Sequence, residues 1–251
     1  PGNIERVFSS QKLQLVDRSL LNSRFTLDRD AGFQLRHHFN VGKTFLIRTK
    51  LAVSQGEGLN RKSQSAGNGY TGRIELLPFG KFSKKGDYFA SDLKREEKPK
   101  LMLSFTYDYN DNALRSGGQM GQDITGSTRD LQNIQADAHF KYKGLSFFGE
   151  YANRKTMDGI AVNELNEVYY TGSALNLQAG YLFKNNWEIA GRYTQVNPED
   201  ITGYNNIEQY TLGFSKYVVG HNLKIQGDIG LTQEDNKENT VLFRLQTEFN
   251  F

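Results

Sequence analysis

The feature that most constrains the fold is a two-residue alternation of apolar and polar side chains that recurs along the chain. At the end of the chain, TVLFRLQTEFNF, the apolar residues are Val241, Phe243, Leu245, Phe249 and Phe251. Successive side chains of a β-strand point to opposite faces, so this pattern predicts a strand with one apolar and one polar face. Two structures fit such a strand: a half-buried edge strand of a soluble sheet, or a membrane-barrel strand between lipid and a water-filled lumen.

The alternation recurs in ten earlier segments, which makes eleven predicted strands in all. The earlier segments cover residues 30–39, 43–53, 70–78, 100–110, 133–142, 144–152, 174–183, 186–194, 208–217 and 222–231. The predicted strands run about nine to eleven residues, the length that crosses a bilayer at a tilt. Strands of soluble proteins are nearer about five or six residues.

The predicted connections alternate in length. Tight turns fall near residues 143–144, 185–186 and 219–220, and long polar connections cover 54–69, 110–130, 153–172, 196–206 and 232–240. The exception is 80–100, a long connection on the side of the short turns. Short turns on one side and long loops on the other are the arrangement of bacterial outer-membrane barrels. The sequence therefore predicts an all-β protein, an antiparallel transmembrane β-barrel.

Composition excludes several other classes. The 251 residues are 37% hydrophobic with a mean hydropathy of −0.63 and include no run long enough for a transmembrane helix. The absence of cysteine excludes disulfides and thiolate metal sites. A formal charge of +3 does not indicate a nucleic-acid partner. The first residues, PGNIERVF, do not resemble a signal peptide, as expected of a mature or truncated chain.

The odd number of predicted strands indicates a missing part. Bacterial single-chain barrels have even strand numbers. We therefore expect further strands upstream of this sequence. Residues 1–29 are less regular and lead into the first predicted strand from the side of the long loops.

The run SSQKLQLVDRSLLNSRFTLDRDAGFQL carries a more specific pattern. Its elements are Val16, Asp17, Arg18 and Ser19, then Phe25, then Arg29, Asp30, Gly32 and Leu35. This pattern resembles the phosphate-selective porin (O/P-type) family. The runs LPFGKFSKKGDYFASDLKREEKPKL and YDYNDNALRSGGQ are similar to Bacteroidetes-type members. The resemblance covers essentially the whole chain, as the C-terminal portion of a longer porin.

The resemblance implies a sixteen-stranded, homotrimeric porin in the outer membrane of a Gram-negative bacterium, a passive channel for small anions such as phosphate. Residues 1–29 would be the inward-folded constriction loop, and residues 30–251 the strands and loops of the barrel. The partners implied are the lipid bilayer with its lipopolysaccharide, and the barrel assembly machinery. That machinery would read a C-terminal signal made by Phe243, Leu245, Phe249 and Phe251.

A pore selects by the charges that line it. Seven cations are the candidate anion-binding residues: Arg18, Arg24 and Arg29 in the constriction loop, and Arg36, Arg48, Lys50 and Arg73 on strands. Arginine stays charged and binds oxyanions with two parallel hydrogen bonds. These cations have an alternative role in pairing with acids to stiffen the wall. That alternative is stronger for Arg18 and Arg29, which adjoin aspartates, than for Arg48 and Lys50, whose own strand has no acid.

Later strands carry balanced charges on one face: Asp137 with Lys141, Glu188 with Arg192, Lys224 with Asp228, and Arg244 with Glu248. The basic excess is therefore expected beside the constriction.

Catalysis and cofactors are poorly supported. His37 and His38 point to opposite faces of one strand and cannot share a metal. His139 near Asp137 could form an acid–base pair, but no matching nucleophile is evident. Asp228, Glu234, Asp235 and Glu238 suit a solvated loop better than a calcium site. We expect neither an enzyme nor a cofactor. A structural barrel whose pore is blocked, serving as a subunit of a larger complex, remains the alternative function.

Overall fold

The computed structural model describes residues 2–59 and 67–249. Its main feature is one antiparallel sheet of eleven strands, each paired with its neighbours in sequence. The strands are β1 (Gly32–Val41), β2 (Phe45–Ser54), β3 (Gly69–Leu77), β4 (Lys100–Ala113), β5 (Arg129–Tyr142), β6 (Leu145–Thr156), β7 (Gly172–Leu182), β8 (Trp187–Pro198), β9 (Ile207–Val219), β10 (Leu223–Glu234) and β11 (Thr240–Phe249). The prediction of an all-β chain with eleven antiparallel strands is confirmed.

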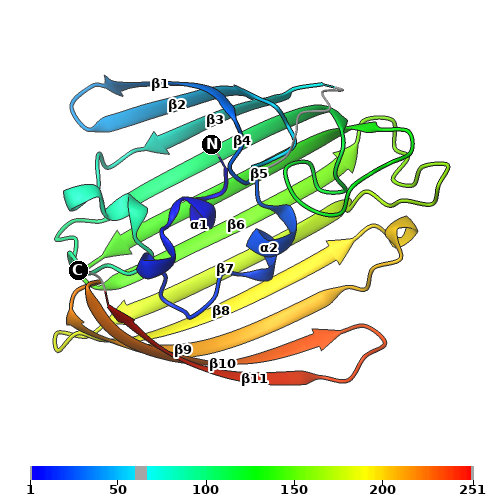
Figure 1. The fold of residues 1–251 in the computed structure, drawn as a ribbon. Coiled ribbons are helices and arrows are strands. Elements are labelled where there is room, and N and C mark those ends of the chain that lie inside the picture. Colours follow the sequence, from blue (N-terminus) through cyan, green and yellow to red (C-terminus); the bar gives the residue numbers. More distant parts are fainter. Residues whose placement is uncertain (1, 60–66, 250–251) are drawn as a thin grey trace.

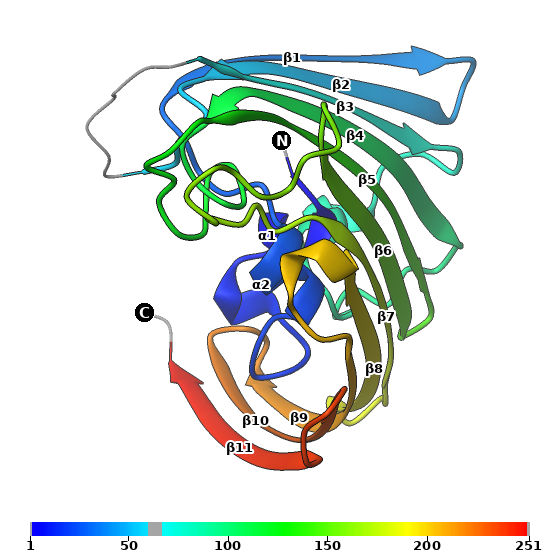
Figure 2. The same cartoon turned by 90° about the vertical axis from the view of Figure 1, so that its right-hand side faces the viewer.

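The sheet is strongly curved and open. In Figure 2 it bends into a trough, with β1 and β11 as its two edges. The strands run side by side across Figure 1 in sequence order. Among the described residues, no helix is long and apolar enough to cross a membrane.

The two faces of the sheet differ as the alternation predicts. On β6, Glu150 and Arg154 are buried on the concave face, whereas Tyr151 is 45% exposed on the convex face. The same division holds on β8, with Glu188 and Arg192 buried and Ile189 exposed. The sheet is therefore polar within its concavity and apolar on its outside, the reverse of a soluble sandwich.

The connections are also sorted by end. The short-turn end carries 42–44, 78–99, 143–144, 183–186 and 220–222, and the long-loop end carries 55–68, 114–128, 157–171, 199–206 and 235–239. Asn186, at positive φ of 63°, and Gly220, at 56°, allow two of the tight turns to close. The exceptional connection 78–99 lies at the short-turn end, where the sequence placed it.

Short helices occupy the concavity (Figure 2). The inner segment, residues 2–29, contains α1 (Ile4–Val7), η1 (Ser10–Lys12) and α2 (Leu20–Phe25). The turn segment, residues 78–99, contains η2 (Ser83–Tyr88), and η3 (Asp200–Thr202) lies in a long loop.

Two small apolar cores hold the inner segment against the sheet. One joins the inner segment, the turn segment and the sheet, and its members are Ile4, Phe8, Leu13, Leu46, Leu77, Phe82, Ala90, Met102 and Phe148. The other packs Leu21 and Phe25 of α2 against Ala152, Ala174 and Val196 of β6, β7 and β8, with Tyr170. Burial of these side chains stabilises the inner segment by about 2 kcal/mol for each large one.

Candidate functional site: the lined concavity

Carboxylates of the sheet fix the path of the inner segment. Glu150 of β6 accepts hydrogen bonds from the backbone nitrogen of Glu5 (2.8 Å) and from Asn3 Nδ2 (3.0 Å). Glu188 of β8 accepts one from Gln14 Nε2 (2.8 Å). Asp228 of β10 accepts one from the backbone nitrogen of Val16 (2.8 Å). The inner segment therefore lies across the concave faces of β6 to β10.

The inner segment also supplies charge to this wall. Arg192 lies 3.7 Å from Glu5 and donates to the backbone oxygen of Asp17 (2.8 Å). Arg244 pairs with the Asp17 side chain at 2.7 Å. Burial raises the pKa of Glu5, although Arg192 opposes that rise. Arg192 and Arg244 of this wall therefore both bind groups of the inner segment.

The charge balance of the later strands arises across strands rather than along them. Asp137 binds Arg73 of β3, not Lys141. Lys224 pairs with Glu248 (3.1 Å), and Arg244 with Asp228 (2.7 Å), and both pairs face each other in the β10–β11 register. The two β10–β11 ion pairs form because facing residues of neighbouring strands lie closer than residues four apart on one strand.

The turn segment folds into the concavity and is held there by Lys141. Its ammonium donates to the backbone oxygens of Gly86, Phe89 and Ser91, each at 2.7 Å. Within the turn segment, the backbone nitrogen of Ser83 donates to Glu96 (2.6 Å). The backbone nitrogen of Gly144, in the next turn, donates to Asp92 (2.8 Å). The backbone nitrogen of Ala90 donates to the backbone oxygen of Lys12 in the inner segment (3.1 Å). The inner segment and the turn segment are therefore joined to each other within the concavity.

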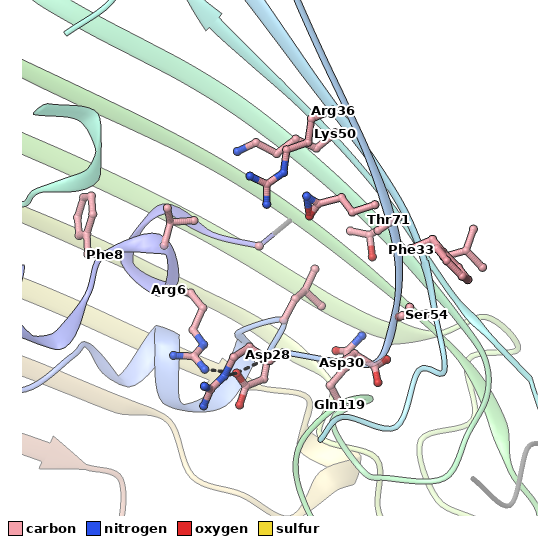
Figure 3. A pocket seen from close by; sticks show the side chains of 18 of the residues that line it. Arg6, Phe8, Asp28, Asp30, Phe33, Arg36, Lys50, Ser54, Thr71 and Gln119 are labelled. Atoms are coloured by element: carbon pink, nitrogen blue, oxygen red, sulfur yellow. Dashed lines mark hydrogen bonds and ion pairs between the residues drawn. The ribbon is translucent and has the colours of Figure 1, made fainter. Parts of the chain in front are cut away.

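A first cavity of about 690 Å³ lies between the inner segment and β1 to β3. Its lining contains five cations: Arg6, Arg18, Arg29, Arg36 and Lys50. In Figure 3, Arg36 and Lys50 project from the sheet toward this space, and Arg6 reaches Asp28 on its opposite side. Despite desolvation, the Arg6 hydrogen bond lowers the pKa of Asp28. Asp30, the other acid of the lining, accepts from the backbone nitrogen of Gly56 (2.6 Å).

A second cavity of about 700 Å³ adjoins the turn segment. It shares Val7, Ser9, Arg36 and Tyr88 with the first cavity, so the two meet at Arg36. The other ionisable residues of its lining are Lys12, His38, Arg48, Lys81, Lys84, Lys85 and Asp87. Together the cavities line one side of the concavity with cations from the long-loop end to the short-turn end.

Several predicted site residues are held in ion pairs. Lys50 Nζ lies 2.5 Å from Glu75, and Arg48 lies 2.5 Å from Asp87. Arg73 binds Asp137 through two parallel hydrogen bonds (2.6 and 2.9 Å) and Glu75 through a third (2.8 Å). Its side chain is only 1% exposed. The structure therefore gives Arg73 the wall-stiffening geometry, and the acids that pair with Arg48 and Lys50 come from other segments.

The remaining predicted cations are spread more widely. Arg36 lines both cavities, and within the described residues no carboxylate lies within ion-pair distance of it. Arg18 donates to the backbone oxygens of Phe8 (2.6 Å) and Glu5 (3.3 Å), and burial lowers its pKa. Arg29 is 76% exposed at its side chain. Arg24 lies apart from both cavities, over the ring of Tyr170.

Sequence reasoning missed the cations of the turn segment. Lys81, Lys84 and Lys85 line the second cavity, and Lys84 and Lys85 have positive φ angles of 49° and 61°. The signal was present in FSKKGDYF, because Phe82 is buried and Phe89 lies against the ring of His221. Apolar residues on both sides of a basic turn indicate a segment that packs inward rather than into solvent.

The structure also places His139 and the aromatic residues at the end of the chain. His139 is buried among the rings of Phe8, Phe82 and Phe148. Because Asp137 binds Arg73, the acid–base pair with His139 is not formed. The described residues contain no group of three or more metal-ligating side chains. Phe243, Leu245 and Phe249 are exposed on the convex face, and Phe251 lies outside the described residues.

Comparison of the chain with models of known protein families gives no match, and comparison with curated proteins finds no significant relative.

Proposed function

We propose that the eleven strands are part of the wall of a closed outer-membrane β-barrel, a porin through which small anions such as phosphate diffuse. Support for the membrane location comes from the convex face. It exposes rows of large apolar side chains, such as Leu212 and Phe214 on β9, which are 54% and 52% exposed. A face of this kind is stable against lipid, where only closed sheets satisfy every backbone group. The open edges β1 and β11 then require further strands between them.

The proposal that the permeant solutes are anions is based mainly on the cations without acid partners in the two connected cavities. Among the described residues, Arg36, Lys81, Lys84 and Lys85 line these cavities with no carboxylate in ion-pair distance. Successive weak sites of one sign let an anion enter and leave without being trapped. The resemblance of residues 16–35 to phosphate-selective porins supports the same function, and with it a homotrimer in the outer membrane of a Gram-negative bacterium.

One observation favours a second candidate. The inner and turn segments both occupy part of the concavity and are joined to each other. A barrel occupied in this way could serve as a structural subunit of a larger complex with a blocked pore. A channel measurement separates the two functions, because a blocked barrel carries no current.

The test is the reversal potential of the purified native protein in planar bilayers under a salt gradient. We expect anion selectivity and a chloride current that added phosphate reduces. In water, a unit positive charge about 5 Å from the ion path stabilises an anion by about 0.8 kcal/mol and destabilises a cation by the same amount. Arg36→Gln should therefore lower the anion-to-cation permeability ratio about sixteenfold. Lys155→Gln is the matched control, because Lys155 is exposed on the convex side of β6. An unchanged ratio in Arg36→Gln would refute the anion path, and a silent channel would favour the structural subunit.

A further inference from the structure

The two ends of the sheet carry opposite exposed charge. At the short-turn end, lysines occupy four of the five connections, including Lys43, Lys143 and Lys184, and Lys216 stands at the end of β9. Of the carboxylates in these connections, Asp87, Asp92 and Glu96 are buried and Glu97 is exposed. The long-loop connections are acidic instead, with Asp123, Asp158, Glu164, Glu167, Glu199, Asp200, Asp235 and Glu238.

Three of the short-turn lysines are not explained by the anion path. Lys143, Lys184 and Lys216 line neither of the two connected cavities. Lys216 faces Trp187 in the β8–β9 register, on the convex face. These three lysines, here called the lysine rim, therefore lie at the short-turn end of the sheet and outside the two connected cavities.

Aromatic side chains on the convex face accompany the lysine rim. Lys216 Nζ lies 5.3 Å from the centre of the Trp187 ring, and Lys143 Nζ lies 5.1 Å from that of Tyr142. Trp187 is 45% exposed, as is Tyr181. Tryptophan and tyrosine prefer the depth of lipid headgroups, and a lysine beside such a ring holds its ammonium at that depth.

We propose that the lysine rim, with Trp187 and Tyr142, binds the phosphate of anionic phospholipids in the leaflet next to the short turns. This inference rests on the membrane location proposed above. The rings of Trp187 and Tyr142 at the boundary of the apolar face favour a lipid headgroup over water as the surroundings of these lysines. Each lysine near an anionic headgroup increases the binding constant for that lipid about fivefold. Three lysines therefore produce a marked preference for anionic over zwitterionic lipid.

The single tryptophan of the sequence provides the readout. The native protein is reconstituted in phosphatidylcholine vesicles that contain an equal small fraction of either brominated phosphatidylglycerol or brominated phosphatidylcholine. Bromine quenches nearby tryptophan, and subtraction of the signal of Trp187→Phe isolates this ring. We expect at least threefold stronger quenching by the brominated phosphatidylglycerol.

The triple variant Lys143→Gln, Lys184→Gln, Lys216→Gln should lose this headgroup preference. The triple variant Lys143→Arg, Lys184→Arg, Lys216→Arg should keep the headgroup preference. Lys155→Gln, at the other end of the convex face, should keep it as well. Replacing chloride with inorganic phosphate at equal ionic strength should leave the preference unchanged, and its loss would assign the site to free phosphate and overturn the proposal. Equal quenching by both lipids would overturn the lipid site alone, whereas no quenching by either would also refute the membrane location.

Discussion

At the residue scale, buried cations in this chain act mainly as connectors. Arg73 joins β3 to β5 through Asp137, and Lys141 joins β5 to the turn segment through three carbonyl oxygens. Such bonds are worth more than neutral ones, and a buried group that loses its partner is costly. A cation on the polar face of a strand is therefore weak support for solute binding until its partners are known.

Lys141→Met tests the connection to the turn segment. It leaves three carbonyl oxygens without their donor, so we expect the free energy of unfolding to fall by about 3 kcal/mol. The turn segment should also become sensitive to added protease. Urea unfolding of the lipid-reconstituted protein and proteolysis of residues 78–99 provide the two measurements. Lys143→Met, two residues along in an exposed turn, is the control, and equal effects of both changes would contradict this role.

At the element scale, two long loops are clamped together by glutamates. Glu167 accepts from Thr125 Oγ1 (2.6 Å), from the backbone nitrogen of Gly126 (2.9 Å) and from Asn163 Nδ2 (2.7 Å). Hydrogen bonds, first that from Thr125, lower the pKa of Glu167 to about 2. A carboxylate with a lowered folded-state pKa stabilises the fold above its unfolded pKa, and that stabilisation is lost as pH falls through the folded pKa.

The clamp between the loops should therefore hold at neutral pH and loosen between about pH 4.5 and pH 2. Protection of the Gly126 amide from hydrogen exchange, corrected for intrinsic rates, should fall over this interval. Glu167→Gln should show low protection already at pH 7. Protection that does not change with pH in the native protein would mean that other contacts hold the loops.

The elements also show how far the sequence could predict the fold. Alternation is a local property, so it located all eleven strands and the sorting of loops by length. It could not place Leu46, Leu77, Met102 and Phe148, apolar side chains on the polar face that receive the inward segments. Their sign in the sequence is a pair of adjacent apolar residues, as at Phe147 and Phe148. The ion pairs were missed because they join distant segments, as between Arg48 and Asp87.

At the scale of the whole molecule, the edges β1 and β11 are the test of closure. A barrel has no free edge, whereas an open sheet leaves a row of unpaired amides on each outer strand. In membranes containing the native protein, amides of β1 that do not bond to β2 should exchange as slowly as those of β6. Fast exchange confined to β1 and β11, with slow exchange of β6 as the internal reference, would contradict the closed barrel.

The connectivity of the sheet also has a consequence for the order of folding. Every strand pairs with its neighbour in sequence, so each hairpin can form with a short loop closure. The inner segment instead bonds to partners far along the chain, with Gln14 and Glu188 separated by 174 positions and Val16 and Asp228 by 212. These contacts exist only once the later hairpins are in place. The segment synthesised before all the strands described here is thus among the last to reach its native position.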